Sequence, residues 1–346
     1  MLTIRSLLLL GLLCVAEAAP GRKGNGNGNA QANTQQTAQT AQEQADQIPG
    51  GISEATDGST ILDMTAEVNG QTLRFKVSAP ADQFTTASGV SGGSQAANAT
   101  GGSLGLNVLL HGDGGQSFFD FPNQAVQNNL AGVAVLAPDP NLFWGGGSGL
   151  DRTDGVAHAQ LVNDLVVDVL PTVMAFNASH VSFTGVSGGS LLLSGFFVPA
   201  HIGNFADATA GQESQVLLNC GGLTPQVDVA PAAAAAIPNV RMHFQTTQDE
   251  LALLQPAIPA AIKAYEQLAL AGGLDAAAVG ALQTVDNSPV GGHCEFDEQD
   301  FVSGVQLMAD SFASVMQGGD GTLNGTDVNV LNPVVGNEDL VFSGAT

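Results

Sequence analysis

The sequence predicts an α/β fold with a mostly parallel sheet, helices on both of its faces, and a β-hairpin at its N-terminal side. Short apolar runs of strand length recur along the chain, and stretches with apolar residues at helical spacing separate them. Before these runs, two strand-like segments flank an Asn-Gly pair. Strands that are apolar throughout and alternate with helices indicate parallel pairing with both faces covered.

The hairpin is expected at the start of the folded region, near Ser59. Apolar residues are frequent in 61–68, and 73–77 alternates apolar residues with basic ones. Asn69-Gly70 between them favours the positive φ angles of a tight turn. Residues 85–103 are rich in Ser, Gly, Ala and Thr, which predicts an exposed loop after the hairpin.

The elements that follow are short buried strands and longer helices. The predicted strands are 106–110, 132–136, 181–183, 215–218 and 240–244. The predicted helices are 124–130, 156–174, 190–197, 259–271 and 299–316. No internal repeat interrupts this alternation, so a single folded domain is expected.

The N-terminal residues 1–18 are expected to be a signal peptide. A basic residue precedes a short apolar run from Leu7 to Val15, and Ala16-Glu17-Ala18 fits the small-x-small cleavage pattern. The alternative is a membrane anchor, for which the run is short. Residues 19–58 are rich in Gly, Asn, Gln and Thr, which predicts a disordered leader before a folded domain at 59–346.

Composition narrows the range of partners. Lys and Arg number 8 against 32 Asp and Glu, and the formal net charge is −24. Such a chain repels phosphate backbones and anionic lipid, so nucleic acid and membranes are not expected partners. We expect a secreted, extracellular monomer.

Export also gives the cysteines a meaning. Cys14 leaves with the signal peptide, so Cys220 and Cys294 remain. Two cysteines in an oxidising compartment most simply form one disulfide, and two buried free thiols are the alternative. Three Asn-x-Ser/Thr sequons are candidate glycosylation sites: Asn98, Asn177 and Asn324.

The main chemical signal is the segment 185–189, Gly-Val-Ser-Gly-Gly, which matches Gly-x-Ser-x-Gly. It follows a predicted strand and precedes an apolar helix, which is the setting of a nucleophile elbow. There, the hydroxyl of Ser187 lies at a helix N-terminus, where the dipole favours developing negative charge. The alternative is an ordinary Gly/Ser turn in a glycine-rich chain. We predict Ser187 as the nucleophile.

A serine hydroxyl needs a base, and the base needs a carboxylate that orients it. His293, in a glycine-flanked loop before the last helix, is the predicted base, whereas His111 and His243 are expected to be structural. Asp249 directly follows the last predicted strand and is the predicted acid, with Glu250 as the competing carboxylate. The chain order Ser, Asp, His is the one found with this elbow.

An oxyanion hole needs two backbone N–H groups that point at the tetrahedral intermediate. Gly188, directly after the nucleophile, would supply one. The other is expected from the loop 111–115, with Asp113 as first candidate and Gly114 as second. Aromatic residues near this loop are candidates either for an apolar pocket or for core packing: Phe118, Phe119, Phe121, Phe143 and Trp144.

Together these residues resemble the α/β-hydrolase superfamily, and within it secreted esterases of the polyhydroxybutyrate-depolymerase and feruloyl-esterase kind. The likeness rests on the loops 111–115, 244–250 and 292–296 and spans residues 104–316. It implies the α/β-hydrolase fold and hydrolysis of a small-molecule or polymer ester through an acyl-enzyme, without metal or cofactor. Gly189-Ser190 departs from the pattern, because many such esterases have bulkier residues there.

Two other functions stay open at this point. A serine peptidase would use the same elbow and the same type of intermediate. A non-catalytic extracellular or cell-wall protein would keep the fold alone, although the complete Ser, Asp, His order favours an enzyme. In an enzyme, a bridge from Cys220 to Cys294 would tie the loop of His293 to the sheet.

Overall fold

The computed structural model describes most of the chain beyond the predicted signal peptide. The described residues are 39–99, 101–120, 128–207, 209, 211–296 and 301–344, with the backbone alone described for Asp120 and 301–305. They belong to one compact unit, Gln39–Thr346. The predicted signal peptide and residues 19–38 of the predicted leader lie outside them. Within the described part, no helix has the length and apolar character to span a bilayer.

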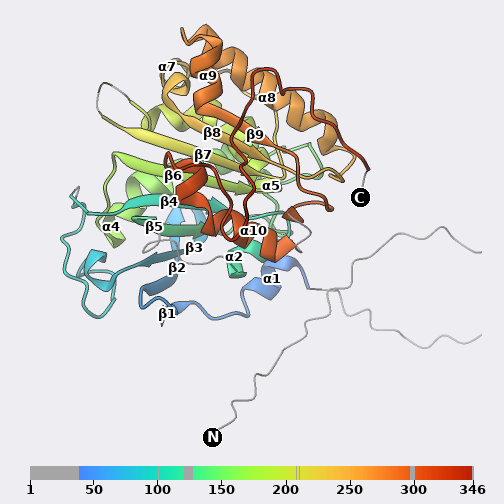
Figure 1. The fold of residues 1–346 in the computed structure, drawn as a ribbon. Coiled ribbons are helices and arrows are strands. Elements are labelled where there is room, and N and C mark those ends of the chain that lie inside the picture. The colour runs from blue at the N-terminus through green and yellow to red at the C-terminus, as the bar shows by residue number, and fades with distance from the viewer. Residues whose placement is uncertain are drawn as a thin grey trace, which may run out of the picture. The chain divides into compact units, whose positions relative to one another are not determined.

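A ten-stranded sheet organises the described residues, in the order β1-β2-β3-β5-β4-β6-β7-β8-β9-β10 (Figure 1). From β5 to β9 in this order the pairing is parallel, whereas β1, β2, β3 and β10 pair antiparallel with their neighbours. The predicted α/β architecture, a mostly parallel sheet with helices on both faces, is confirmed. The strands are β1 (Gly51–Glu54), β2 (Thr60–Val68), β3 (Gln71–Ala79), β4 (Gly105–Leu110), β5 (Leu130–Val135), β6 (His180–Val186), β7 (Glu213–Asn219), β8 (Arg241–Gln245), β9 (Gln283–Asp286) and β10 (Asn332–Pro333).

The predicted hairpin is confirmed as β2 and β3. Val68 pairs with Gln71, and Asn69 and Gly70 in the turn have φ angles of 51° and 77°. All five predicted buried strands are present as β4 to β8. The sequence missed β9, because its residues Gln283, Thr284 and Asp286 are polar although all are buried.

Two hydrophobic clusters cover the two faces of the sheet. Along β4, Val108 and Leu110 contact one cluster and Leu109 contacts the other, as strand alternation requires. The first cluster includes residues of α3, α5, α7 and α8, and the second includes residues of α2, α10 and α11. The helices are α1 (Ala41–Ala45), α2 (Gln116–Asp120), α3 (Gly155–Asp164), α4 (Leu170–Val173), α5 (Gly188–Leu192), α6 (Val198–His201), α7 (Pro231–Ala236), α8 (Leu254–Ala271), α9 (Ala276–Leu282), α10 (Phe301–Asp310) and α11 (Phe312–Met316).

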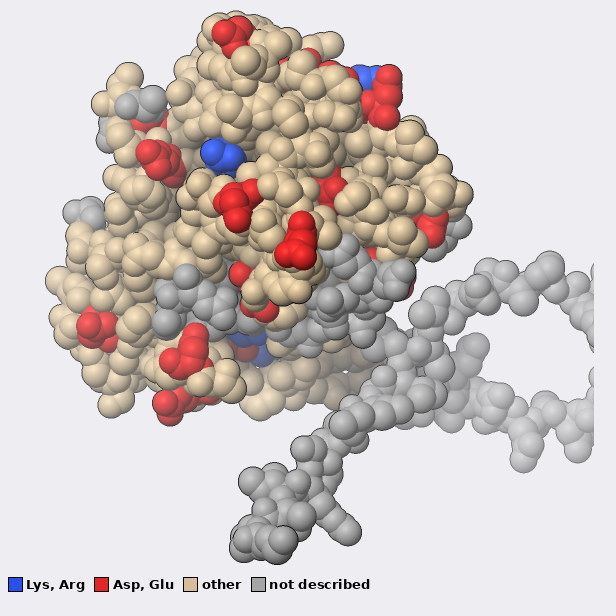
Figure 2. Space-filling view, viewed as in Figure 1, with Lys and Arg blue, Asp and Glu red and all other residues tan. Residues whose placement is uncertain are grey.

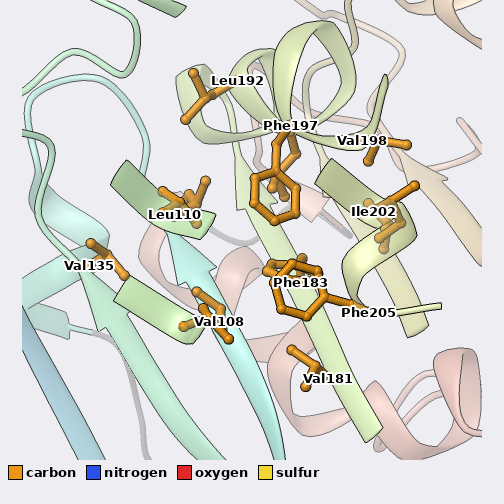
Figure 3. Packing of buried hydrophobic residues seen from close by; sticks show 14 of the residues in the cluster. Val108, Leu110, Val135, Val181, Phe183, Leu192, Phe197, Val198, Ile202 and Phe205 are labelled. Atoms are coloured by element: carbon orange, nitrogen blue, oxygen red, sulfur yellow. The ribbon is translucent and has the colours of Figure 1, made fainter. Parts of the chain in front are cut away.

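Packing against β6 fixes the segment that follows the predicted nucleophile. The ring of Phe183 lies 4.5 Å from that of Phe197 and 5.2 Å from that of Phe205, measured between centroids. Figure 3 shows Val198 and Ile202 beside these rings and Val108 on the neighbouring strand. The helix after β6 is thereby held on the sheet by aromatic and aliphatic contacts.

Two predicted helices contain a π-helical turn. The predicted helix 156–174 consists of α3, the π turn η2 (Leu165–Val169) and α4. The predicted helix 190–197 consists of α5 and the π turn η3 (Leu193–Phe197), which continues into α6. Pro171 and Pro199 follow these turns at the start of α4 and α6. Because proline lacks the N–H and crowds the preceding carbonyl, a widened turn accommodates it.

Three predicted boundaries are wrong or partly outside the described residues. The helix predicted from Pro259 begins at Leu254, so this proline lies inside α8. Leu130, predicted as a helix end, begins β5, and residues 124–127 before it are not described. The helix predicted at 299–316 is divided into α10 and α11, with 299–300 not described.

The predicted leader is also wrong over its last part, because α1 and β1 lie within 39–58. Thr40 and Glu43 form a capping box at the start of α1. The buried side chain of Arg74 donates hydrogen bonds to the carbonyls of Ala45 and Ile48, at 2.8 and 2.9 Å. These contacts with a strand residue order a segment whose own composition is polar.

Acidic side chains are scattered over the face of the molecule that Figure 2 shows. Figure 2 shows several Asp and Glu on one face and few Lys or Arg, as the net charge of −24 implies.

Candidate active site

Ser187 lies on a sharp turn between β6 and α5. Its backbone angles are φ 50° and ψ −113°, which is a strained conformation for a residue with a side chain. The N–H of Ser187 donates to the carbonyl of Asn219 on β7 at 2.9 Å, and its own carbonyl accepts from Leu191 at 3.1 Å. These bonds hold the turn between a neighbouring strand and the first turn of α5.

Glycines flank Ser187 because backbone segments approach one another closely there. A Cβ at Gly185 would lie 2.6 Å from the backbone of Ser190, and a Cβ at Gly189 would lie 2.1 Å from the carbonyl oxygen of Leu110. Both distances are too short for real contacts. Because Ser187 lies between β6 and α5, the strand–turn–helix setting expected for the Gly-x-Ser-x-Gly segment is present.

His293 contacts the hydroxyl of Ser187. Its Nε2 lies 2.8 Å from Ser187 Oγ, although the two residues are 106 positions apart in the chain. Its Nδ1 is hydrogen bonded to Oε1 of Glu250. The His293 side chain is 18% exposed and the Glu250 side chain is fully buried. This is the geometry of a nucleophile, a base and an orienting carboxylate.

The carboxylate in contact with His293 is Glu250, so the choice of Asp249 is corrected. Glu250 also accepts hydrogen bonds from Thr246 Oγ1 at 3.1 Å and from the N–H of Leu251 at 2.8 Å. Asp249 instead accepts a hydrogen bond from Ser343 Oγ at 2.7 Å, on the C-terminal segment. The two adjacent carboxylates thus serve different contacts.

The loops after β8 and β9 are joined by hydrogen bonds that extend the strand pairing. The N–H groups of Gln248 and Asp249 donate to the carbonyls of Pro289 and Gly291, at 2.9 and 3.2 Å. Thr247 Oγ1 donates to the carbonyl of Gly292 at 2.9 Å. This register fixes which of the two consecutive carboxylates meets the imidazole, and it depends on contacts between distant segments.

Cys220 and Cys294 form the predicted disulfide; they are 74 positions apart in sequence, and 5.3 Å separates their Cα atoms. The bridge joins the end of β7 to the residue after His293. The donor atoms of Cys220, Cys294 and His293 lie within 4.8 Å of one another. Because both sulfurs are bonded to each other, thiolate ligands for a metal are not offered at this place.

The candidate oxyanion donors differ in their hydrogen bonding. The N–H of Gly114 already donates to the carbonyl of Leu142 at 3.2 Å, so this second candidate is occupied. The N–H groups of Asp113 and Gly188 have no hydrogen-bond partner within the described part of the chain. Gly188 is the first residue of α5, where backbone N–H groups lack helical partners.

His111 and His243 have the structural surroundings expected of them. Nε2 of His111 accepts from the N–H of Ala137 at 2.9 Å, and burial lowers the pKa of His111 to about 4. His243 lies between Thr284 Oγ1 and Gln245 Oε1, at 2.9 and 3.0 Å, and burial lowers its pKa as well. Both imidazoles are therefore neutral and remain hydrogen bonded inside the fold.

The aromatic residues near the oxyanion loop divide into two groups. Phe118 and Trp144 are fully buried, which fits core packing. Phe119 and Phe143 are partly exposed and stay candidates for a substrate-facing surface. Phe121 lies outside the described residues.

Positive φ angles at residues with bulkier side chains gather around this site. Among the described residues other than Gly and Asn, four have positive φ: Leu142, Ser187, Cys220 and Cys294. Ser187 is the nucleophile candidate, the two cysteines bridge to the base loop, and Leu142 accepts the N–H of Gly114. Such strain is commonly found at functional sites, where the surrounding structure enforces it.

Comparison with known proteins gives matches among solved structures alone; no protein-family model and no curated protein sequence matches the chain. One match is a cold-adapted esterase from an Arctic intertidal metagenomic library, at 13% identity and a TM-score of 0.39, covering 73% of this chain and 92% of that one. Another is a thermostable esterase from Pseudomonas putida ECU1011, at 13% identity and a TM-score of 0.43, covering 75% and 83%.

A third match is a feruloyl esterase module from Clostridium thermocellum complexed with sinapinate. It has 13% identity and a TM-score of 0.43, and the alignment covers 75% of this chain and 88% of that one. The solved structures that resemble the chain thus include esterases, one of them of the feruloyl type.

Proposed function

We propose that the protein is a serine hydrolase that cleaves carboxylic esters through an acyl-enzyme on Ser187. The observation that carries this proposal is the contact of His293 with both Ser187 Oγ and the buried Glu250. A serine hydroxyl is a weak nucleophile by itself, and a base in hydrogen-bond contact activates it. A carboxylate on the other imidazole nitrogen orients the ring and stabilises its protonated form.

The proposed reaction has two halves. Ser187 Oγ attacks the acyl carbon while His293 Nε2 takes the hydroxyl proton, and the tetrahedral intermediate expels the alcohol, which receives that proton from His293. Water then attacks the acyl-enzyme, with His293 again taking and returning a proton, and the acid is released. Glu250 keeps its hydrogen bond with Nδ1 of His293 throughout and so holds the ring in place.

The oxyanion of each intermediate is proposed to accept hydrogen bonds from the N–H groups of Gly188 and Asp113. Both are without partners in the described structure, and Gly188 lies at the N-terminus of α5, where the helix dipole favours negative charge. The single donor at Gly114 is left out, because Leu142 already uses it.

A fluorophosphonate probe tests the assignment of the nucleophile. The wild-type protein is expected to become labelled, and the Ser187→Ala and His293→Ala variants are expected to lose labelling. Ser190→Ala is the matched control, because Ser190 Oγ donates to the carbonyl of Asn219 and lies on the same turn. A folded wild-type protein that is never labelled would refute the proposal.

The type of bond cleaved is tested separately. A panel of p-nitrophenyl esters of increasing acyl length, feruloyl and acetyl-xylan substrates, and peptide anilides compares esters with amides. We propose that esters are cleaved and anilides are not. Faster turnover of anilides would make the protein a peptidase on the same fold.

Export to an extracellular compartment is part of the proposal. The Cys220–Cys294 bridge supports it, since such bonds persist in oxidising surroundings. Mass spectrometry of the protein recovered from culture medium would locate the mature N-terminus, expected at Ala19. The same measurement would detect glycans at Asn98, Asn177 and Asn324.

A further inference from the structure

A partly buried ion pair lies beside the candidate oxyanion hole. Arg152 Nη1 and Nη2 donate to Oδ1 and Oδ2 of Asp113, both at 2.8 Å. The same Nη1 donates to the carbonyl of Trp144 at 3.0 Å. The Arg152 side chain is 2% exposed and the Asp113 side chain 24%. A bidentate pair of this kind fixes the direction of the carboxylate as well as its charge.

The carboxylate of Asp113 packs closely against Gly188 in the nucleophile elbow. Its Oδ1 lies 2.0 Å from the point that a Cβ on Gly188 would occupy. No side chain fits there, so the glycine after Ser187 makes room for this oxygen. A negative charge therefore lies next to the backbone N–H that is proposed to hold the oxyanion.

That placement is unfavourable for the reaction unless the charge is compensated. A carboxylate close to a developing oxyanion would slow its formation by about 100-fold or more at the effective dielectric near a protein surface. Within the described residues, the basic side chain in contact with Asp113 is that of Arg152. Its guanidinium neutralises the carboxylate where the oxyanion would form.

The surroundings of Arg152 hold it in this place. A Cβ at Gly145 would lie 2.8 Å from Arg152 Cβ, so a glycine with φ 79° packs directly on it. Nε of Arg152 is buried without a hydrogen-bond partner in the described structure. Because buried ion pairs contribute little net stability relative to apolar side chains, stabilisation alone gives a poor account of this pair.

We propose that Arg152 is a positioning residue of the oxyanion hole, which cancels the charge of Asp113 and holds its loop against the elbow. The inference rests on the proposed function, because it concerns the transition state of acyl transfer. Its distinctive claim is that the positive charge is required only while the negative charge is present.

The test is a cycle of Arg152→Gln, Asp113→Asn and the double variant, with kcat and KM measured on p-nitrophenyl acetate. Arg152→Gln is expected to lower kcat about 100-fold with KM changed by less than about threefold, since the charge acts on the transition state. The double variant is expected to regain at least about tenfold of that loss. Arg241→Gln, at the amino end of β8, is the matched control for loss of a positive charge.

Each outcome decides between the proposals. A wild-type protein that is neither labelled nor active refutes the proposed function. An active wild type with an unchanged Arg152→Gln variant, or a double variant no better than Arg152→Gln, overturns the role of Arg152. If Arg152→Gln does not fold, the double variant and Arg152→Lys decide, because the lysine keeps the charge without the bidentate geometry. A kcat within about tenfold of wild type in either supports charge compensation, and a loss of about 100-fold in both overturns it.

Discussion

Ser187 and its neighbours are positioned by close backbone packing, whereas Glu250 and His293 are positioned by bonds between loops that are distant in sequence. On the nucleophile side, glycines at 185 and 189 admit backbone approaches that any Cβ would block. On the acid–base side, side chains and backbone of two loops are joined by hydrogen bonds and one disulfide. The first arrangement depends on residues that are consecutive in the sequence. The second depends on contacts between segments that meet only when the chain folds.

We expect substitutions of the two adjacent carboxylates on the acid–base side, Asp249 and Glu250, to have very different effects on activity. Glu250→Gln should lower kcat/KM by about 10³–10⁴-fold, because the carboxylate charge that orients His293 is lost. Asp249→Asn should lower it by less than about tenfold, since Asp249 contacts Ser343 and its amide still accepts that bond. Steady-state kinetics of both variants measure the ratio. Equal losses would contradict the assignment of the acid.

Removing the disulfide should weaken the acid–base side more than the sheet. For Cys220→Ala with Cys294→Ala, opening a loop of 74 residues should cost up to about 4 kcal/mol of stability. Activity at low temperature should fall further than the far-UV circular dichroism, because the bridge adjoins His293. Wild type in reductant should behave like the double variant, and the double variant should not respond to reductant. Full activity with free thiols would count against this.

On the nucleophile side, His111 should lower the stability of the folded protein in acid. Its pKa is about 4 in the folded protein against 6.5 ordinarily, so both states are neutral above pH 6.5. As the pH falls from 6.5 towards 4, the unfolded chain binds a proton that the folded chain does not, which removes about 3 kcal/mol of stability. Urea unfolding across this range should show a shallower decline for His111→Gln.

His158 and His243 are also buried with lowered pKa values, so part of the slope should survive in His111→Gln. An identical slope in His111→Gln and wild type would show that His111 is not the source.

The smallest effect is expected for one added methyl group on the elbow. Gly188→Ala places a Cβ where Asp113 Oδ1 lies, so about 1–3 kcal/mol of stability should be lost through overpacking. Gly101→Ala is the matched control, because a Cβ there meets no atom within 4 Å. Thermal unfolding of the two variants compares them. A Gly188→Ala variant as stable as Gly101→Ala would mean that the loop of Asp113 moves to accommodate the added methyl group at little cost.

The two sides also explain which parts could be predicted from the sequence. Gly185 to Gly189 are adjacent, so the elbow is visible as a motif, and the apolar strands around it follow from composition. Glu250 differs from Asp249 only through the register between the loops after β8 and β9, which no local pattern reports. Arg152 gave no sequence signal, because its importance comes from a partner 39 positions away.

The N-terminal boundary was missed for a related reason. Residues 39–58 are polar, and the helix and strand within them are short. Their order depends on Arg74, a strand residue whose side chain satisfies two carbonyls of that segment. A pattern of alternating apolar residues indicates which side of a strand Arg74 occupies, but not that another segment covers it.

The π turn η3 (Leu193–Phe197) acts as a one-residue insertion carried inside the nucleophile helix. An α-helix turns by about 100° per residue, so the extra residue sets the rotational phase of everything after it. In that phase Val198 and Ile202 belong to the same buried cluster as Phe183 (Figure 3). Deleting one residue from η3 would restore a regular helix and turn this apolar face away from the sheet. The extra residue in η3 therefore sets which face of the following helix packs against β6, the strand that precedes Ser187.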